Sequence, residues 1–162
     1  MKTRRLTFYS NNIDYSDLTS VEFREADEKY IDYLLGVEEK FPQQVREIWN
    51  RQAFKGRFVD RVIFHYDGRV EVSFQDRSIL MLQDANLLHA PRRPIIEEIC
   101  WVYEPALIWY CEEVTLNEAE DSLFLDARLS EGLLSVQFQD ASFYDGNRQF
   151  WTTGGPNLDE KE

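Results

Sequence analysis

The chain has few of the side chains that usually act as nucleophiles or metal ligands. The chain has two cysteines, Cys100 and Cys111, and two histidines, His65 and His89. Their spacing lacks the close ligand pairs of common zinc sites, so we expect no metal. Neither cysteine lies at a glycine-rich turn or a helix start that would lower its pKa. We therefore expect buried thiols rather than a disulfide or a nucleophile.

The motifs of the common enzyme classes are also missing. The sequence has no Gly-x-Ser-x-Gly elbow, no Walker-type phosphate loop and no dinucleotide-binding fingerprint. His89, in a predicted loop, is the better candidate for a reactive histidine, since His65 falls within a predicted strand. We expect no catalytic residue and no cofactor.

Acidic residues, by contrast, are abundant between positions 97 and 121, a stretch that also contains four aromatic residues. Glycosidases use two carboxylates in such surroundings, but the sequence fixes no separation between any two of them. A solvated strand end is the commoner position for paired acids such as Glu112 and Glu113. The acids concerned are Glu97, Glu98, Glu104, Glu112, Glu113, Glu118, Glu120 and Asp121.

The same stretch supplies our candidate partner-binding face. Aromatic residues with charged neighbours are typical anchors of protein interfaces. Core packing is the competing explanation for the aromatic ones. The candidates are Trp101, Tyr103, Trp109, Tyr110, Glu112 and Glu113.

The chain carries a net charge of −12, and the charge is uneven. Residues 1–81 hold 13 Lys+Arg against 14 Asp+Glu, whereas residues 82–162 hold 5 against 16. Such a surface repels phosphates, which disfavours nucleic acid and anionic membranes as partners. It suits solubility, and it would also suit a basic protein partner. No apolar run approaches the roughly 20 residues of a membrane span, so we expect a cytoplasmic protein.

The elements that would position these residues are organised around residues 61–82. Val62, Phe64 and Tyr66 precede Asp67-Gly68, and Val70, Val72 and Phe74 follow it in alternation with polar residues. Period-two alternation around Asp-Gly predicts a β-hairpin. After the polar residues 75–78, the segment 79–82 predicts a third strand of an antiparallel meander.

This meander resembles a polo box. The resemblance rests on Asp67-Gly68-Arg69-Val70-Glu71-Val72-Ser73-Phe74-Gln75-Asp76-Arg77-Ser78-Ile79-Leu80 and is confined to residues 61–82. It implies a non-enzymatic module that binds protein partners, often in centrosomal or cell-cycle settings. No phosphopeptide-binding residue is recognisable, so the resemblance assigns none.

Part of the meander pattern recurs 64 residues later. The segment from Gly68 to Ser78 aligns with the one from Gly132 to Ser142, including Phe-Gln-Asp in both. An internal duplication and chance similarity between alternating strands both remain open.

Helices are predicted before the meander. From Ala26 to Lys40, apolar residues recur at helical spacing, and Ile31 and Leu35 widen that stripe. Pro42 should end or kink this helix, and a shorter one is expected from Gln43 to Gln52. Before them, Leu6–Ser10 and Ser20–Arg24 are candidates for a strand hairpin.

After the meander the predictions are less uniform. Gln83–Ala90 is expected to be a short helix or loop, and Pro91-Arg92-Arg93-Pro94 either an extended loop or a docking site for an acidic group. Within Ile95–Leu116 a hairpin of Ile99–Tyr103 and Leu107–Thr115 is favoured, with a helix starting at Pro94 as the alternative. Further strands are predicted at Leu123–Leu129, Leu133–Phe138 and Phe143–Trp151.

These elements predict one α+β domain over residues 1–152, with a flexible acidic tail over residues 153–162. The domain should be a largely antiparallel β-sheet with the N-terminal helices packed on one face. We expect a non-catalytic protein–protein interaction module or adaptor. The alternatives are a small acidic inhibitor or immunity protein that neutralises a basic toxin or nuclease, and a small-ligand-binding β-barrel-like protein. Nothing in the sequence excludes a homodimer formed through an unpaired edge strand.

Overall fold

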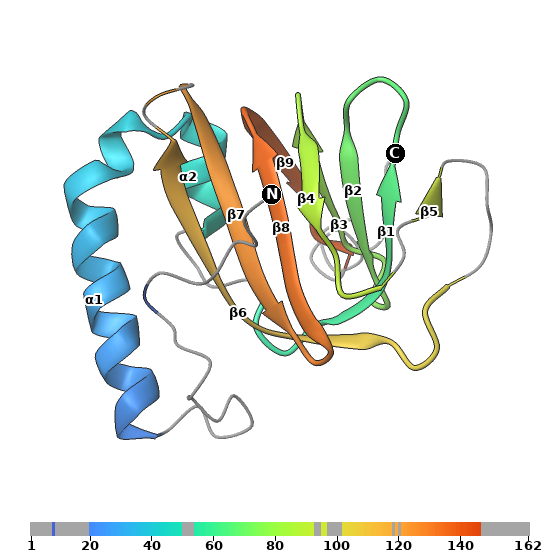
Figure 1. The fold of residues 1–162 in the computed structure, drawn as a ribbon, viewed down its shortest axis with the longest axis horizontal. Helices are drawn as coiled ribbons and strands as arrows, with labels where there is room; N and C mark the ends of the chain where they lie inside the picture. Colours follow the sequence, from blue (N-terminus) through green and yellow to red (C-terminus); the bar gives the residue numbers. More distant parts are fainter. Residues whose placement is uncertain are drawn as a thin grey trace, which may run out of the picture.

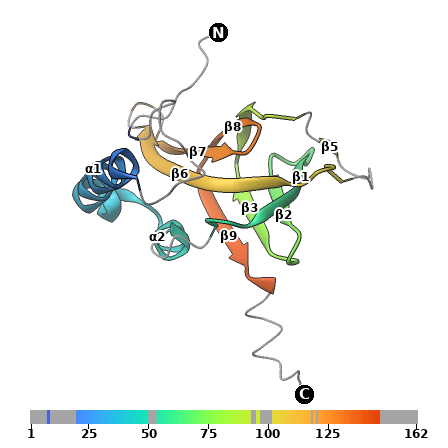
Figure 2. The same ribbon diagram turned by 90° about the horizontal axis from the view of Figure 1, so that it is seen from below.

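The computed structural model describes residues 8, 20–49, 54–92, 95–96, 102–117, 119 and 121–146. These residues form an α+β fold with two helices followed by a largely antiparallel sheet (Figure 1). The helices lie together on one side of the sheet (Figure 2). The fold class predicted from the sequence is therefore confirmed. Among the described residues, no helix is both long and apolar enough to cross a membrane.

Helix α1 (Val21–Val37) starts earlier than predicted because Ser20 caps it. The Ser20 side chain accepts a hydrogen bond from the backbone N–H of Phe23 at 3.2 Å, as an N-cap does. The expected strand at Ser20–Arg24 is therefore wrong, and its proposed partner at Leu6–Ser10 lies outside the described residues except for Phe8.

The buried face of α1 is narrower than predicted. Phe23, Ala26 and Tyr30 are buried, whereas Ile31 and Leu35 are 42% and 66% exposed. These two residues therefore do not widen the apolar stripe. A 3-10 turn η1 (Glu38–Lys40) leads to α2 (Gln43–Trp49), which buries Val45 and Trp49.

In the described part of the chain, nine strands follow the helices. The order of the sheet is β4-β8-β7-β6-β1-β2-β3-β9, and β5 pairs with β1 in parallel. The strands are β1 (Phe58–Phe64), β2 (Val70–Phe74), β3 (Ile79–Gln83), β4 (Asn86–His89), β5 (Ile95–Ile96), β6 (Leu107–Asn117), β7 (Ser122–Leu129), β8 (Gly132–Phe138) and β9 (Asp140–Tyr144).

The predicted meander is confirmed as β1–β3, in which Val62 faces Val72 and Val72 faces Leu80. The predicted strands at Leu123–Leu129 and Leu133–Phe138 are β7 and β8. Three other predictions need correction. Gln83–Ala90 contains strand β4, the helix starting at Pro94 is replaced at Ile95–Ile96 by β5, and Val102 and Tyr103 belong to no strand.

The sheet curls round until its two ends meet. Strand β4 continues β3, and β9 continues β8, so two bent segments pair along both of their halves. Gln83 faces Asp140 before the bend and Asn86 faces Gln137 after it, without a shift in register. The first segment bends at Asp84, which has a positive φ of 49°, a conformation that Asp tolerates better than most residues.

Apolar side chains fill the inside of this curled sheet. Val62, Val72, Leu80, Leu125 and Val136 from five strands are all fully buried. One end is closed by aromatic rings, since Phe54 lies 5.1 Å from Trp109 and 4.9 Å from Phe143, and Trp49 of α2 joins them. A small closed sheet is normally filled in this way.

Candidate functional site

Strand β6 positions most of the residues predicted to meet a partner, but it does not present them to solvent. Cys111, Glu112, Glu113 and Val114 are four consecutive buried residues, because the strand has covered surfaces on both sides. The pairing of β6 with β7 is irregular between positions 109 and 111 of β6. As a result, Trp109 lies in the main core and Cys111 lies under α1.

The six predicted partner-binding residues are therefore not brought together on one face. Tyr103, Trp109, Glu112 and Glu113 are buried, and Tyr110 is half-buried against the cluster under α1. Trp101 lies outside the described residues. A partner approaching the folded domain would not reach the four buried side chains directly.

Glu112 points toward the core, where the indole N–H of Trp109 donates a hydrogen bond to its Oε1 at 2.8 Å. Burial raises the pKa of this carboxyl to about 7, and the Trp109 hydrogen bond and Lys55 only partly oppose the effect. Burial also raises the pKa of the Cys111 thiol, helped by the charges of Glu112 and Glu113. Cys111 is a free, buried cysteine, as expected, and its thiol is poorly suited to act as a nucleophile.

Glu113 points to the other face of β6 and opens a row of polar residues across three strands. Glu113 faces Asp126 of β7, and Asp126 faces Ser135 of β8. All three side chains are buried, with exposed fractions of 0%, 1% and 0%. The Ser135 hydroxyl donates a hydrogen bond to Asp126 Oδ1 at 2.6 Å. We call Glu113, Asp126 and Ser135 the carboxylate row.

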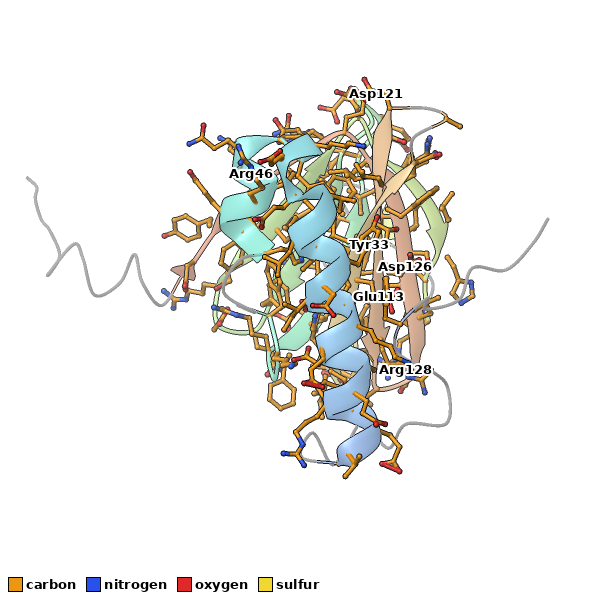
Figure 3. All side chains as sticks on the ribbon, turned by 90° about the vertical axis from the view of Figure 1, so that its left-hand side faces the viewer. Tyr33, Arg46, Glu113, Asp121, Asp126 and Arg128 are labelled. Carbon is orange, nitrogen blue, oxygen red and sulfur yellow. The ribbon has the colours of Figure 1, made fainter. Side chains whose placement is uncertain are left out.

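Buried carboxylates on the outer face of a sheet need both a cover and hydrogen-bond donors. Helix α1 supplies part of the cover, and the one described residue of the N-terminal stretch supplies a donor. The backbone N–H of Phe8 donates to Glu113 Oε2 at 2.6 Å, across 105 positions of sequence. Figure 3 shows Tyr33, Glu113, Asp126 and Arg128 close to the line where α1 meets the strands.

The line of contact between α1 and β6, the α1–β6 seam, is held by two tyrosines. Past Trp109, where pairing with β1 stops in the described part of the chain, Tyr30 and Tyr33 meet the edge of β6. The backbone N–H groups of Val114 and Leu116 donate to the Tyr30 and Tyr33 hydroxyls at 2.6 and 2.9 Å. Burial raises the pKa of Tyr30 well above its usual value, so this hydroxyl keeps its proton.

Phe8 lies against both tyrosines. Its ring centroid is 5.5 Å from that of Tyr30 and 5.2 Å from that of Tyr33, within the range of favourable aromatic pairs. Phe8, Tyr33 and Asp126 were not predicted as site residues. The helical spacing placed Tyr30 on the inner face of its helix, but no sequence pattern indicated that Phe8 would contact it.

Other candidate groups have structural roles in the described residues. Arg92, from the predicted basic loop, donates from Nε to Glu131 Oε1 at 2.7 Å and lies over the Tyr103 ring. This ion pair lowers the pKa of Glu131. The other arginine of that loop, Arg93, lies outside the described residues.

The two histidines do not meet a nucleophile or a metal site in the described residues. His65 Nε2 lies 3.0 Å from Glu71 Oε1, and the Ser73 hydroxyl donates to the other oxygen of Glu71 at 2.8 Å. The carboxylate thus stands between serine and histidine, whereas a nucleophilic triad needs the histidine between serine and acid. His89 is exposed at the end of β4, and no group of three or more metal-ligating side chains occurs in the part of the chain that the structure describes.

Comparison with known proteins gives no family assignment. No family model matches the chain. No curated protein matches its sequence either.

Proposed function

We propose that this chain is a non-catalytic protein–protein interaction module or adaptor. The observation that carries the proposal is the position of its buried carboxylates. Glu113 and Asp126 are buried on a covered outer face of the sheet, while the inside of the sheet is filled mostly by apolar side chains. Such an arrangement gives a protein segment hydrogen-bond donors and acceptors to meet.

The partner is proposed to be a basic protein rather than nucleic acid or a membrane surface. The solvent side of α1 and η1 bears six exposed acidic residues against the exposed bases Arg24, Lys29 and Lys40. With the net charge of −12, this surface attracts cations and repels phosphates. The acids are Glu22, Glu25, Glu28, Asp32, Glu38 and Glu39.

The same charge supports a second candidate, a small acidic inhibitor or immunity protein of a basic toxin or nuclease. This function predicts tight, salt-sensitive binding, whereas an adaptor with an apolar interface would keep its partner in high salt. The polo-box resemblance of β1–β3 is compatible with the adaptor and adds no residue to the site. A cytoplasmic location remains part of the proposal, which does not exclude a homodimer.

Affinity capture from native lysate, at low and high salt, tests the proposal. The expected result is a protein retained in stoichiometric amount, whose complex re-forms from the two purified components. The acidic-inhibitor function is favoured if that protein is lost at high salt. It is favoured also if a bait carrying Glu25→Lys and Asp32→Lys fails to retain the protein. A bait that retains no protein from a competent lysate would contradict both functions.

A further inference from the structure

Phe8 has the contacts of a bound peptide residue. Its backbone N–H donates to a buried carboxylate, Glu113, at 2.6 Å. Its ring packs against the rings of Tyr30 and Tyr33. A fixed acceptor for a main-chain N–H, together with an aromatic contact surface, is a common way for proteins to recognise one residue of an extended segment.

The groups that receive Phe8 are held in place by the folded domain itself. Tyr30 and Tyr33 are anchored by their hydroxyls to the backbone of β6, and α1 is capped by Ser20. Glu113 lies within a strand that pairs along its length with β7. The receiving groups are thus preorganised, and preorganisation lowers the cost of binding a segment from elsewhere.

Charge also favours a particular kind of segment. Phe8 follows one of the most basic stretches of the chain, since Lys2, Arg4 and Arg5 fall within its first five residues. The receiving carboxylate, Glu113, is buried and accepts the Phe8 N–H, so an occupant without a donor would forfeit this hydrogen bond. A segment replacing Phe8 must therefore bring N–H donors or positive charge.

We propose that Tyr30, Tyr33 and Glu113 form the partner-binding site of the module, and that Phe8 is its intramolecular occupant. The site binds a basic peptide segment that inserts one aromatic side chain and donates its backbone N–H to Glu113. Phe8 competes with that segment and so restrains partner binding. This inference rests on the proposed function and specifies its site and its regulation.

The test is a binding titration with a fluorescein-labelled peptide of residues 2–12, followed by fluorescence anisotropy on the full chain. Phe8→Ala should bind the peptide at least 10-fold more tightly than the wild type, because a tethered competitor acts at an effective concentration on the order of millimolar. A peptide with alanine in place of Phe8 should bind at least 10-fold more weakly. Phe8→Leu, a milder change, should give an intermediate gain.

Matched variants locate the site. In the Phe8→Ala background, Glu113→Gln should weaken peptide binding at least 5-fold, because a neutral acceptor is weaker than a carboxylate. Glu71→Gln, on the outer face of the meander, should leave the affinity unchanged. Circular dichroism and thermal unfolding establish that each variant is folded, and if Phe8→Ala is not, Phe8→Leu is judged by the same criterion.

The inference is overturned if folded Phe8 variants bind the peptide no more tightly than the wild type. If a captured partner still binds the wild type in that case, the proposed function stands and only the site is wrong. If the Phe8 variants bind the peptide tightly but no lysate protein is captured, Phe8 is supported as the occupant and the partner role is overturned.

Discussion

Strands β1–β3 and strands β6–β8 are both antiparallel three-stranded units with an apolar inner face and polar residues on the outer face. In the first unit, His65 and Glu71 form a pair whose side chains are 15% and 16% exposed. In the second, Glu113 and Asp126 are 0% and 1% exposed. The difference lies in the cover, since α1 runs beside β6 and away from β1–β3 (Figures 1 and 2).

The comparison shows that one helix packed on the outer face buries polar residues that the same strand pattern leaves partly exposed elsewhere. Polar groups on an outer face that water reaches can be hydrated, so a partly exposed pair such as His65 and Glu71 contributes less free energy than a fully buried one. A covered polar face depends on donors brought by another segment. We therefore place the binding site at the α1–β6 seam and not on the meander.

The largest expected effect concerns Glu112 and pH. Because burial raises its folded-state pKa from 4.5 to about 7, the folded state holds the proton more tightly than the unfolded state. The stability that this group contributes is complete below pH 4.5 and is lost as the pH rises to 7, by about 3 kcal/mol. Glu112→Gln removes this loss.

Denaturant unfolding of the wild type and Glu112→Gln between pH 4.5 and pH 7 measures this effect. The free energy of unfolding of the variant, relative to that of the wild type, should rise over this interval. A difference that stays flat would show that Glu112 ionises normally in the folded protein despite its burial.

A smaller effect is expected from matched removals in the two units. Asp126→Ala should lower the free energy of unfolding by about 2 kcal/mol, because Ser135 and the other groups around it lose a buried acceptor. Glu71→Ala should cost about 1 kcal/mol or less, because water reaches its neighbours. Chemical denaturation of both variants measures these losses. Equal losses of unfolding free energy would contradict the difference between the covered and the uncovered unit.

Tyr30→Phe should cost about 1 kcal/mol, since the N–H of Val114 loses its acceptor at the edge of β6. Tyr144→Phe is the control, because Tyr144 is 49% exposed and should change stability by less than about 0.5 kcal/mol. Thermal unfolding of both variants gives the comparison. A Tyr30→Phe variant as stable as the wild type would show that the seam does not depend on that hydroxyl.

The smallest effect is expected on the solvent side of α1. Leu35→Lys should change the free energy of unfolding by less than about 0.5 kcal/mol, because Leu35 is 66% exposed. Thermal unfolding of this variant is the measurement. A loss of 2 kcal/mol or more would mean that this side of the helix is covered in solution.

The sequence predicted the parts of the fold that depend on local pattern. The Asp67-Gly68 turn, the alternation of β2 and the strands β7 and β8 follow from side-chain period alone. The same local pattern failed where the chain path depends on distant contacts. Phe74-Gln75-Asp76 turns the chain back into β3, whereas the matching Phe138-Gln139-Asp140 continues forward into β9, which pairs with β3.

The candidate site was harder to predict because burial depends on what covers a residue. Glu112 and Glu113 lie in a strand with apolar neighbours, and the pattern favoured a solvated strand end. The cover that buries Glu113 includes α1, over 70 positions away, and a contact from Phe8, 105 positions away. Neither contact can be read from the periodicity of β6. An interface was therefore expected at Glu112 and Glu113, whereas the structure buries Glu112 toward the core and Glu113 in the carboxylate row.

The account depends most directly on Phe8 and Glu113 acting together. The free energies of unfolding of the wild type, Phe8→Ala, Glu113→Gln and the double variant form a double-mutant cycle. If Phe8 is seated on Glu113, the two changes should be coupled by about 1 kcal/mol, the typical value of a hydrogen bond. Losses that add within about 0.3 kcal/mol would show that the two residues act independently, and would contradict the assignment of the α1–β6 seam as the binding site.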